Sequence, residues 1–355
     1  MTFSKPWKFF LMILPMLGSF LCAQAAPAKT PAKKPAAAPV ASKAANTLSR
    51  DPYYSAVVMD AATGQILQEE HASAAAYPAS MIKLMNLFLI LDDVKAGKLR
   101  LDEPVTVTRE VSQIGGRQVW LKEGEVFPLE ELIYAMMIHS ANDAAAALAI
   151  RASGSTEAHA ARMTAKAREL GLHAVFRSVH GLPPGKGQDV DTASALDMAL
   201  LAKALLEKHP ETLKYTSIFT RPFREGNPMQ LASSNKLLVK MPGCDGLKTG
   251  YFYEAGFSIT ATVQRDGRRV IAVIMGSKDK NVRDTKAAEW IEKGFAKLPP
   301  LPPPVVIETN QAPEAVASES EMGKKHDVLL PVLIGLPVVI AVAVTVVLRR
   351  RRKTR

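Results

Sequence analysis

The sequence predicts an α+β fold: an antiparallel sheet formed by both ends of one domain, flanked by helices, with a helical subdomain and a C-terminal transmembrane helix. Strand-like runs stand at the two ends of residues 51–298, and the stretch between them is mostly helix-like. Strands and helices therefore do not alternate as they do in parallel βαβ folds. An uncharged apolar segment at 328–348 gives the transmembrane helix.

Each end of the domain predicts a hairpin. The first, "YYSAVVMDAATGQILQEE", has two strand-like runs around Ala61–Gly64. The second, "FSITATVQRDGRRVIAVIMG", has two β-rich runs around Asp266-Gly267, a dipeptide typical of tight hairpin turns. Apolar periodicity predicts the helices between and after the hairpins, at 80–96, 128–137, 140–152, 157–170, 192–207 and 284–297.

The segments outside the domain predict export and tethering. Residues 1–25 have basic, apolar and small-residue parts in the order of a cleaved signal peptide. An Ala/Pro/Lys-rich linker at 26–50 and a Pro-rich linker at 299–327 flank the domain. The predicted span at 328–348 precedes a basic tail at 349–355, which we expect to stay cytoplasmic. The domain itself is then expected at the cell membrane, on the extracytoplasmic side.

Net charge argues against a nucleic-acid partner. The formal charge is +11, but residues 1–50 and 349–355 together hold 13 of the 45 basic side chains and no acidic ones. The rest of the chain has 32 basic and 34 acidic residues. A nucleic-acid-binding domain would carry its basic surface on the folded part. The histidines and cysteines show no metal-ligand spacing, so we expect no metal and no other cofactor.

One apolar run, "YPASMIKLMNLFLI", places Ser80 three residues before Lys83. In one interpretation Ser80 caps the helix and Lys83 extends to solvent. In the other, Ser80 is a nucleophile beside a base. Burial and the helix dipole would both lower the pKa of Lys83, so that its neutral amine could take the hydroxyl proton.

Two further motifs favour the nucleophile. Ser140-Ala141-Asn142 opens another helix-like run, and Lys248-Thr249-Gly250 stands at the start of what should be a strand. The ordered set S-x-x-K, S-x-N, K-T-G resembles that of the penicillin-binding proteins and class A β-lactamases. Segments such as "HSANDAAAALA" and "DGLKTGYFYEAGFS" are similar to the D-alanyl-D-alanine carboxypeptidases of family S11, the low-molecular-mass penicillin-binding proteins.

The resemblance implies a role for each motif. Ser80 would attack the penultimate D-Ala carbonyl of a peptidoglycan pentapeptide, with Lys83 as base. Ser140 would relay a proton to the leaving amine, supported by Lys248, and Asn142 would bind the substrate amide. Peptidoglycan stem peptides are then the substrates, β-lactams are inhibitors, and the role is peptidoglycan remodelling and cell shape.

The substrate strand and the carboxylate follow from the same resemblance. Thr249 and the strand after it would bind the peptide in extended form. Backbone N–H groups of Ser80 and of the strand near Phe252 would hold the oxyanion, and Gly250 would leave room for substrate. Arg283 would grip the terminal carboxylate, unless it is a surface arginine at a helix start. We expect His180 and Asp197, which also match the family, to be structural.

Three alternatives stay open on the sequence. An endopeptidase acting on cross-links would use the same chemistry. A β-lactamase needs an acidic residue for fast deacylation; Glu169 is the best candidate, and 173–190 offers only Asp189. An inactive wall-binding or penicillin-sensing module is disfavoured by the three intact motifs.

Overall fold

Both ends of the predicted domain meet in one antiparallel sheet. The computed structural model describes residues 47–185, 187–226 and 228–299. The sheet has five strands in the order β2-β1-β9-β8-β7, and every neighbouring pair is antiparallel. Its strands are β1 (Ser55–Asp60), β2 (Ile66–Glu70), β7 (Cys244–Gly250), β8 (Phe257–Arg265) and β9 (Arg268–Ser277). The prediction of an antiparallel sheet made by both ends of the domain is confirmed.

The two predicted hairpins form as expected. The turn at Ala61–Gly64 joins β1 to β2, and Asp266-Gly267 joins β8 to β9. Asp266 and Gly267 have φ of 48° and 73°. Two successive positive φ angles match the right-handed twist of the flanking strands, which is why this dipeptide is a strong hairpin signal.

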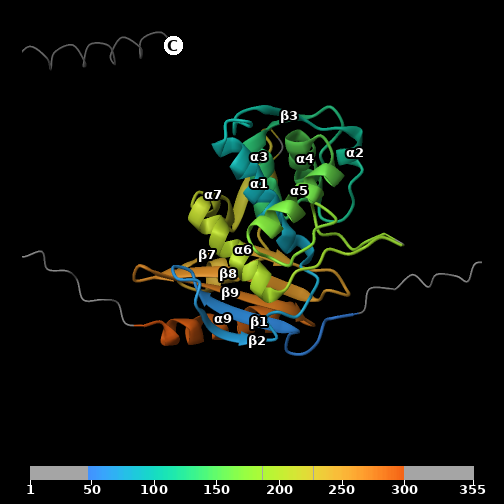
Figure 1. Cartoon of the computed structure of the whole chain (residues 1–355). Helices are drawn as coiled ribbons and strands as arrows, with labels where there is room; N and C mark the ends of the chain where they lie inside the picture. The colour runs from blue at the N-terminus through green and yellow to red at the C-terminus, as the bar shows by residue number, and fades with distance from the viewer. Residues whose placement is uncertain (1–46, 186, 227, 300–355) are drawn as a thin grey trace, which may run out of the picture. The chain divides into compact units, whose positions relative to one another are not determined.

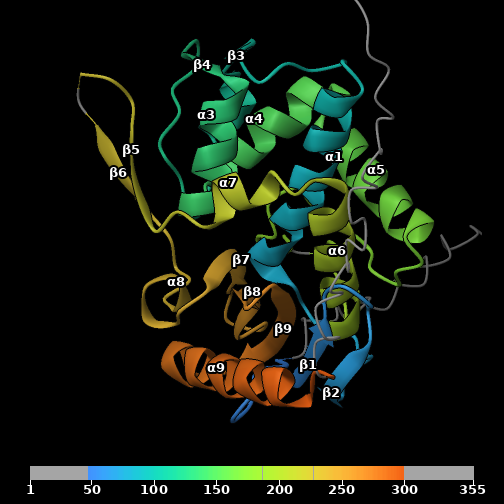
Figure 2. The same cartoon turned by 90° about the vertical axis from the view of Figure 1, so that its left-hand side faces the viewer.

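Helices cover both faces of the sheet. Helix α9 (Lys280–Lys297) packs on one face and α6 (Ala195–Lys208) on the other, as Figures 1 and 2 show. Alternate residues of β1 serve the two layers: Ala56 and Val58 pack toward α9, whereas Val57 and Met59 join the larger core. The sheet is therefore buried on both sides, and β1 is buried along its whole length.

The helical region lies beside the sheet, above it in Figure 1. It is built around α1, a helix whose first nine residues are all buried. Its main helices are α1 (Lys83–Lys95), α3 (Leu129–Tyr134), α4 (Asn142–Ser153) and α5 (Thr156–Glu169). Alanines at 144–147 let α4 approach α1 closely.

Several helix boundaries differ from the sequence prediction for identifiable reasons. A 3₁₀ turn, η1 (Ala79–Ile82), precedes α1, so the predicted helix 80–96 is two segments. A π-helical turn, η2 (Ala135–His139), follows α3 and leaves Ser140 outside α4. Helix α9 starts at Lys280 rather than 284, because the Asp279 carboxylate accepts hydrogen bonds from two N–H groups of the first turn.

The sequence did not predict the short elements in the connecting segments. Two small antiparallel pairs, β3 with β4 and β5 with β6, and three short helices occur there. Their bounds are β3 (Pro104–Thr106), β4 (Val126–Pro128), β5 (Thr220–Phe223), β6 (Met229–Ala232), α2 (Arg109–Ser112), α7 (Thr212–Thr216) and α8 (Leu237–Lys240). The β5-β6 hairpin projects from the body of the domain in Figure 2.

No helix in the described part of the chain is long and apolar enough to cross a membrane. The predicted signal at 1–25, most of the linker at 26–50, the linker from residue 300 on, the span at 328–348 and the tail at 349–355 lie outside the described residues.

Candidate active site

Ser80 and Lys83 are brought together by the 3₁₀ turn. Ser80 lies within η1, and Lys83 is the first residue of α1. Side chains three residues apart eclipse in a 3₁₀ helix, and here Nζ of Lys83 lies 3.0 Å from Oγ of Ser80. Ser80 makes no helix-cap hydrogen bond, and Lys83 is completely buried. The interpretation of a capping serine with a solvent-directed lysine is therefore wrong.

The surroundings of Lys83 favour a neutral amine. Its Nζ donates to Oδ1 of Asn142 at 2.8 Å and to the backbone carbonyl of His180 at 2.6 Å. Burial lowers the pKa of Lys83 well below its usual value, and the nearby charge of Lys248 lowers it further. A neutral amine has two hydrogens, which these two acceptors take. Its lone pair is then left for the hydroxyl proton of Ser80.

Ser140 stands opposite this pair in a left-handed backbone conformation. Its φ is 63° and its ψ is 29°, directly after the π-helical turn. Nζ of Lys248 donates to Oγ of Ser140 at 2.9 Å and to the carbonyl of Thr249 at 3.1 Å. Burial, with the charges of Arg117 and Arg283, lowers the pKa of Lys248 to about 7. This lysine can therefore gain or lose a proton near neutral pH.

Asn142 lies in the site, but protein groups occupy both ends of its amide. Oδ1 accepts from Lys83, and Nδ2 donates to the carbonyl of Gly115 at 3.0 Å. Its backbone N–H donates to the carbonyl of Arg117 at 2.8 Å. The geometry thus makes Asn142 a group that orients Lys83. One hydrogen of Nδ2 remains beside the pocket, so binding of the substrate amide stays a prediction.

The third motif ends a strand rather than starting one. Lys248, Thr249 and Gly250 are the last residues of β7, which lies at the edge of the sheet. The prediction that they open a strand is wrong, because the chain turns into the loop 251–256 immediately afterwards. An edge strand leaves one row of backbone groups unpaired, so it can accept an extended peptide.

Gly250 is required by the protein's own backbone. A Cβ atom there would lie 2.4 Å from the carbonyl oxygen of Pro78 and 3.2 Å from the nitrogen of Ser80. The first distance is shorter than real Cβ contacts and the second is unusually tight, so the glycine lets β7 pack directly against the segment that carries the nucleophile. Gly250 also lines the pocket over Ser80, so the expectation that it leaves room for substrate stays a prediction.

A pocket of about 570 Å³ opens over these groups. The chemical groups come from η1, the turn before α4 and the end of β7, so the pocket lies where the sheet meets the helical region. Phe252 borders it but is mostly buried, stacked on Tyr77 with ring centroids 6.0 Å apart. Arg283 also borders it, buried and paired with Asp284 at 2.7 Å. The interpretation of Arg283 as a surface arginine is therefore wrong.

Sequence reasoning missed three contributors. The backbone carbonyl of His180 has no side-chain signature, although "VHGL" was singled out. Asp191 is buried, accepts two backbone N–H groups and the Ser178 hydroxyl, and is close enough to affect the pKa of Lys83. Arg117 lines the pocket from the loop between α2 and β4 and carries no motif. Asp197, as expected, is structural: it completes the capping box of α6.

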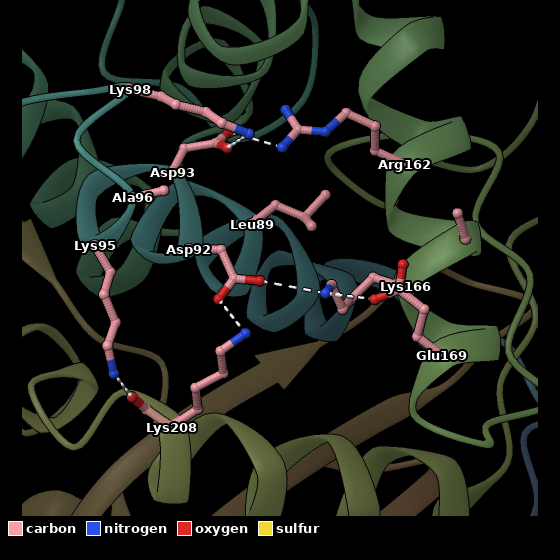
Figure 3. A pocket seen from close by; sticks show the side chains of 11 residues that line it. Leu89, Asp92, Asp93, Lys95, Ala96, Lys98, Arg162, Lys166, Glu169 and Lys208 are labelled. Atoms are coloured by element: carbon pink, nitrogen blue, oxygen red, sulfur yellow. Dashed lines mark hydrogen bonds and ion pairs between the residues drawn. The ribbon is translucent and has the colours of Figure 1, made fainter.

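Neither acidic candidate for a β-lactamase reaches this pocket. Glu169 lies in a different pocket formed by the ends of α1, α5 and α6, where it pairs with Lys166 at 2.6 Å (Figure 3). The side chain of Asp189 is 82% exposed and pairs with Arg177. Among the described residues that line the Ser80 pocket there is no carboxylate.

A serine hydroxyl held by a desolvated lysine, across from a second serine–lysine pair, defines the class of serine enzymes that use lysine as the base. The family model for D-alanyl-D-alanine carboxypeptidases, peptidase family S11, matches residues 44–279. The chain belongs to this family.

Relatives and solved structures agree with that assignment. The chain is 33% identical to the D-alanyl-D-alanine carboxypeptidase DacF of Bacillus subtilis over 246 residues, which are 68% of this chain and 62% of DacF. It is 31% identical to DacC of Escherichia coli, covering 75% of this chain and 68% of DacC. Penicillin-binding protein D2 of Listeria monocytogenes, solved with cefotaxime bound, superposes with a TM-score of 0.63 at 31% identity. That match covers 69% of this chain and 97% of the Listeria chain.

Proposed function

We propose that this chain is a membrane-tethered serine D-alanyl-D-alanine carboxypeptidase that removes the terminal D-alanine from peptidoglycan pentapeptides. One observation carries the proposal: the buried Lys83 amine lies 3.0 Å from the Ser80 hydroxyl, with its other two partners both acceptors. This arrangement removes a proton from serine without a histidine or a metal. Membership of the family supports the choice of substrate.

Acylation begins when Oγ of Ser80 attacks the carbonyl carbon of the penultimate D-Ala while Lys83 takes the hydroxyl proton. The stem peptide lies along the free edge of β7, which runs directly past the nucleophile. The negative charge that develops on the carbonyl oxygen is held by backbone N–H groups of Ser80 and of the loop at Phe252. The serine and its base need no large movement to react.

The leaving group departs as free D-alanine. The C–N bond breaks as the amine nitrogen takes a proton through Ser140, whose hydroxyl is held by Lys248 at 2.9 Å. Water then attacks the Ser80 ester, giving a shortened peptide and restoring the serine. Because the pKa of Lys248 is about 7, this lysine can resupply the proton that Ser140 passes on.

Location and biological role belong to the same proposal. The predicted signal at 1–25 and span at 328–348 support an exported domain tethered to the cell membrane, with residues 349–355 in the cytoplasm. A carboxypeptidase in that place removes the terminal D-alanine, without which a stem peptide can no longer act as the donor in cross-linking. It thereby contributes to peptidoglycan remodelling and cell shape.

The decisive experiment follows D-alanine release from a pentapeptide by the purified chain. Ser80→Ala should abolish both D-alanine release and covalent labelling by a fluorescent penicillin. Ser217→Ala, an exposed serine on the surface of the same domain, is the matched control and should behave as wild type. Release that persists in Ser80→Ala would refute the serine mechanism.

A β-lactamase is disfavoured by the pocket. Fast hydrolysis of a penicilloyl ester uses a carboxylate to activate water, and the described lining of this pocket has none. Penicillin should therefore acylate Ser80 and stay bound. Many turnovers of penicillin per minute by the pure protein would contradict the carboxypeptidase assignment. Cleavage of cross-linked dimers by the same serine would instead extend it to endopeptidase activity.

A further inference from the structure

An exposed tryptophan lines a second groove outside the Ser80 pocket. The side chain of Trp120 is exposed, with 65% of the residue accessible to water. The Trp120 groove, of about 480 Å³, is lined by this residue together with Lys122, Glu125, Arg224, Glu225 and others. Single exposed apolar side chains are common on protein surfaces, so the exposure of Trp120 by itself predicts no function.

The backbone of Trp120 is strained. Its φ is 52°, a left-handed conformation that crowds the Cβ of a bulky residue against the following carbonyl oxygen. Such strain persists only where the surrounding contacts enforce it, and strained residues are concentrated at binding and catalytic sites.

The peptide groups on both sides of Trp120 are held in place. From the interior, the carboxylate of Asp143 accepts the N–H groups of Val119 and Leu121, each at 3.1 Å. From the outside, the guanidinium of Arg224 donates to the carbonyl of Val119 at 2.6 Å and to that of Trp120 at 2.9 Å. Hydrogen bonds from two separate elements therefore fix the direction in which the exposed indole is presented.

Arg224 is itself fixed. Its Nη2 also donates to Oε2 of Glu125 at 2.9 Å, and its guanidinium lies 5.2 Å from the ring centroid of Phe223 and 5.5 Å from that of Phe127. Arg224 directly follows β5, so the β5-β6 hairpin, which projects from the domain in Figure 2, braces the loop that carries Trp120. An aromatic side chain held in this way loses little conformational entropy when it binds a ligand.

The charges of the Trp120 groove favour an uncharged ligand. Its lining has two basic residues, Lys122 and Arg224, and two acidic ones, Glu125 and Glu225. A surface for anionic lipids would instead be predominantly basic. Balanced donors and acceptors around an indole suit a polymer of N-acetylated amino sugars, because the C–H face of a sugar ring packs on the indole while its hydroxyl groups reach the polar side chains.

The Trp120 groove is close to the Ser80 pocket along the chain. Arg117 lines the pocket and Trp120 lines the groove, and three residues span at most about 11 Å. The four stem residues that end at the scissile carbonyl span about 13 Å when extended. A stem peptide bound at Ser80 is therefore long enough for the glycan that carries it to reach the groove.

We propose that the Trp120 groove binds the glycan strand of peptidoglycan, with the indole of Trp120 stacked on a sugar ring and Arg224 holding the loop in position. This inference rests on the proposed carboxypeptidase function for the identity of the polymer. It gives the enzyme a preference for pentapeptides that are attached to glycan over free pentapeptides, because the attached substrate makes contacts at two linked sites.

The first test measures binding of glycan without its peptides. Glycan strands whose stems have been removed by an amidase offer nothing to the Ser80 pocket, and the purified full chain should bind them. Trp120→Ala should weaken this binding about fivefold to thirtyfold, the effect expected for the loss of one stacked and buried aromatic ring. Val239→Ala, an exposed apolar residue on α8, is the matched control and should bind as wild type does. Equal binding by Trp120→Ala and wild type, or no binding by wild type, would overturn the inference.

The second test compares D-alanine release from glycan-attached and free pentapeptides. The ratio of the two kcat/KM values should fall in Trp120→Ala by about the factor by which glycan binding weakens, and Trp120→Tyr should restore most of it. If Trp120 only supported the catalytic pocket, both rates would fall together and the ratio would not change, which would overturn the inference. Binding to phosphatidylglycerol vesicles that is lost in Trp120→Ala, with glycan binding unaffected, would assign the groove to a membrane surface instead.

Failure of the proposed function gives a different result from failure of this inference. Wild type that binds stem-free glycan through Trp120 but releases no D-alanine would refute the carboxypeptidase proposal and support the groove. Wild type that releases D-alanine from pentapeptides but does not bind stem-free glycan would refute the groove alone.

Discussion

Replacing Gly181 by alanine should disable the active site, although Gly181 supplies no reacting group. Gly181 has φ of +77°, and a Cβ there would lie 2.1 Å from the carbonyl oxygen of Ala79 and 2.8 Å from the nitrogen of Ser80. The left-handed conformation costs about 1–2 kcal/mol for a residue with a side chain. Relieving the overlap costs about 1–3 kcal/mol more. We expect Gly181→Ala to lose about 2–5 kcal/mol of unfolding free energy.

The same overlap should displace the nucleophile. Atoms do not approach within 3.0 Å of a Cβ, so the segment Ala79–Ser80 must move by about 1 Å, a shift that costs about a hundredfold in rate when it misaligns reacting groups. Gly171→Ala is the matched control, since Gly171 has φ of +71° with nothing within 4 Å. Urea unfolding and the rate of labelling by fluorescent penicillin measure both effects. Equal stability of the two variants, or labelling of Gly181→Ala at the wild-type rate, would refute this reasoning.

Two further predictions concern buried charges. Lys248 has its pKa lowered from the usual 10.5 to about 7, so above pH 7 the unfolded chain binds more protons than the native one. Unfolding free energy should therefore rise with pH between about 7 and 8.5, by up to about 1.4 kcal/mol per pH unit from this group. Urea unfolding at several pH values should show a smaller rise in Lys248→Met than in wild type. An equal rise in both proteins would contradict the lowered pKa of Lys248. The carboxylate of Asp143 is buried and accepts the N–H groups of Val119 and Leu121. Asp143→Ala should lose about 3 kcal/mol of unfolding free energy, measured by thermal or urea unfolding, and Asp143→Asn should have a stability between those of Asp143→Ala and wild type. If both variants were as stable as wild type, water would be replacing the carboxylate and the prediction would be wrong.

The parts of the site that sequence predicts are those carried by side chains in fixed local spacing. Ser80 and Lys83 are three residues apart, and their pairing needs only one helical turn. The meeting of Ser140 with Lys248 needs the whole fold, and only the family resemblance anticipated it. The sheet was predictable because its hairpins carry turn residues such as Asp266-Gly267.

The remaining contributors leave no local trace. His180 acts through a backbone carbonyl, which any residue could supply. Arg117 is solvent-exposed and lies in a loop without apolar periodicity. Its place at the pocket is evident only from its hydrogen bonds to Ser234 and Ala232 in the folded structure. The left-handed turn at Ser140 follows from a π-helical insertion, which no pattern of apolar residues encodes. The prediction that Lys248-Thr249-Gly250 starts a strand is wrong because the residues after it are as β-prone as those before it, so the sequence does not show that the strand ends there.

The pairing of β1 with β9 also governs when the domain can fold. Ser55 pairs with Met275, almost the full length of the domain away, so the centre of the sheet cannot close until nearly all of the domain has been synthesised. Non-local pairing of this kind makes folding slow, because the chain loses the entropy of closing a long loop before the stabilising contacts form. A slowly folding chain remains unfolded for longer while it is being made. That property suits a protein whose first 25 residues predict a signal peptide for export across a membrane in the unfolded state.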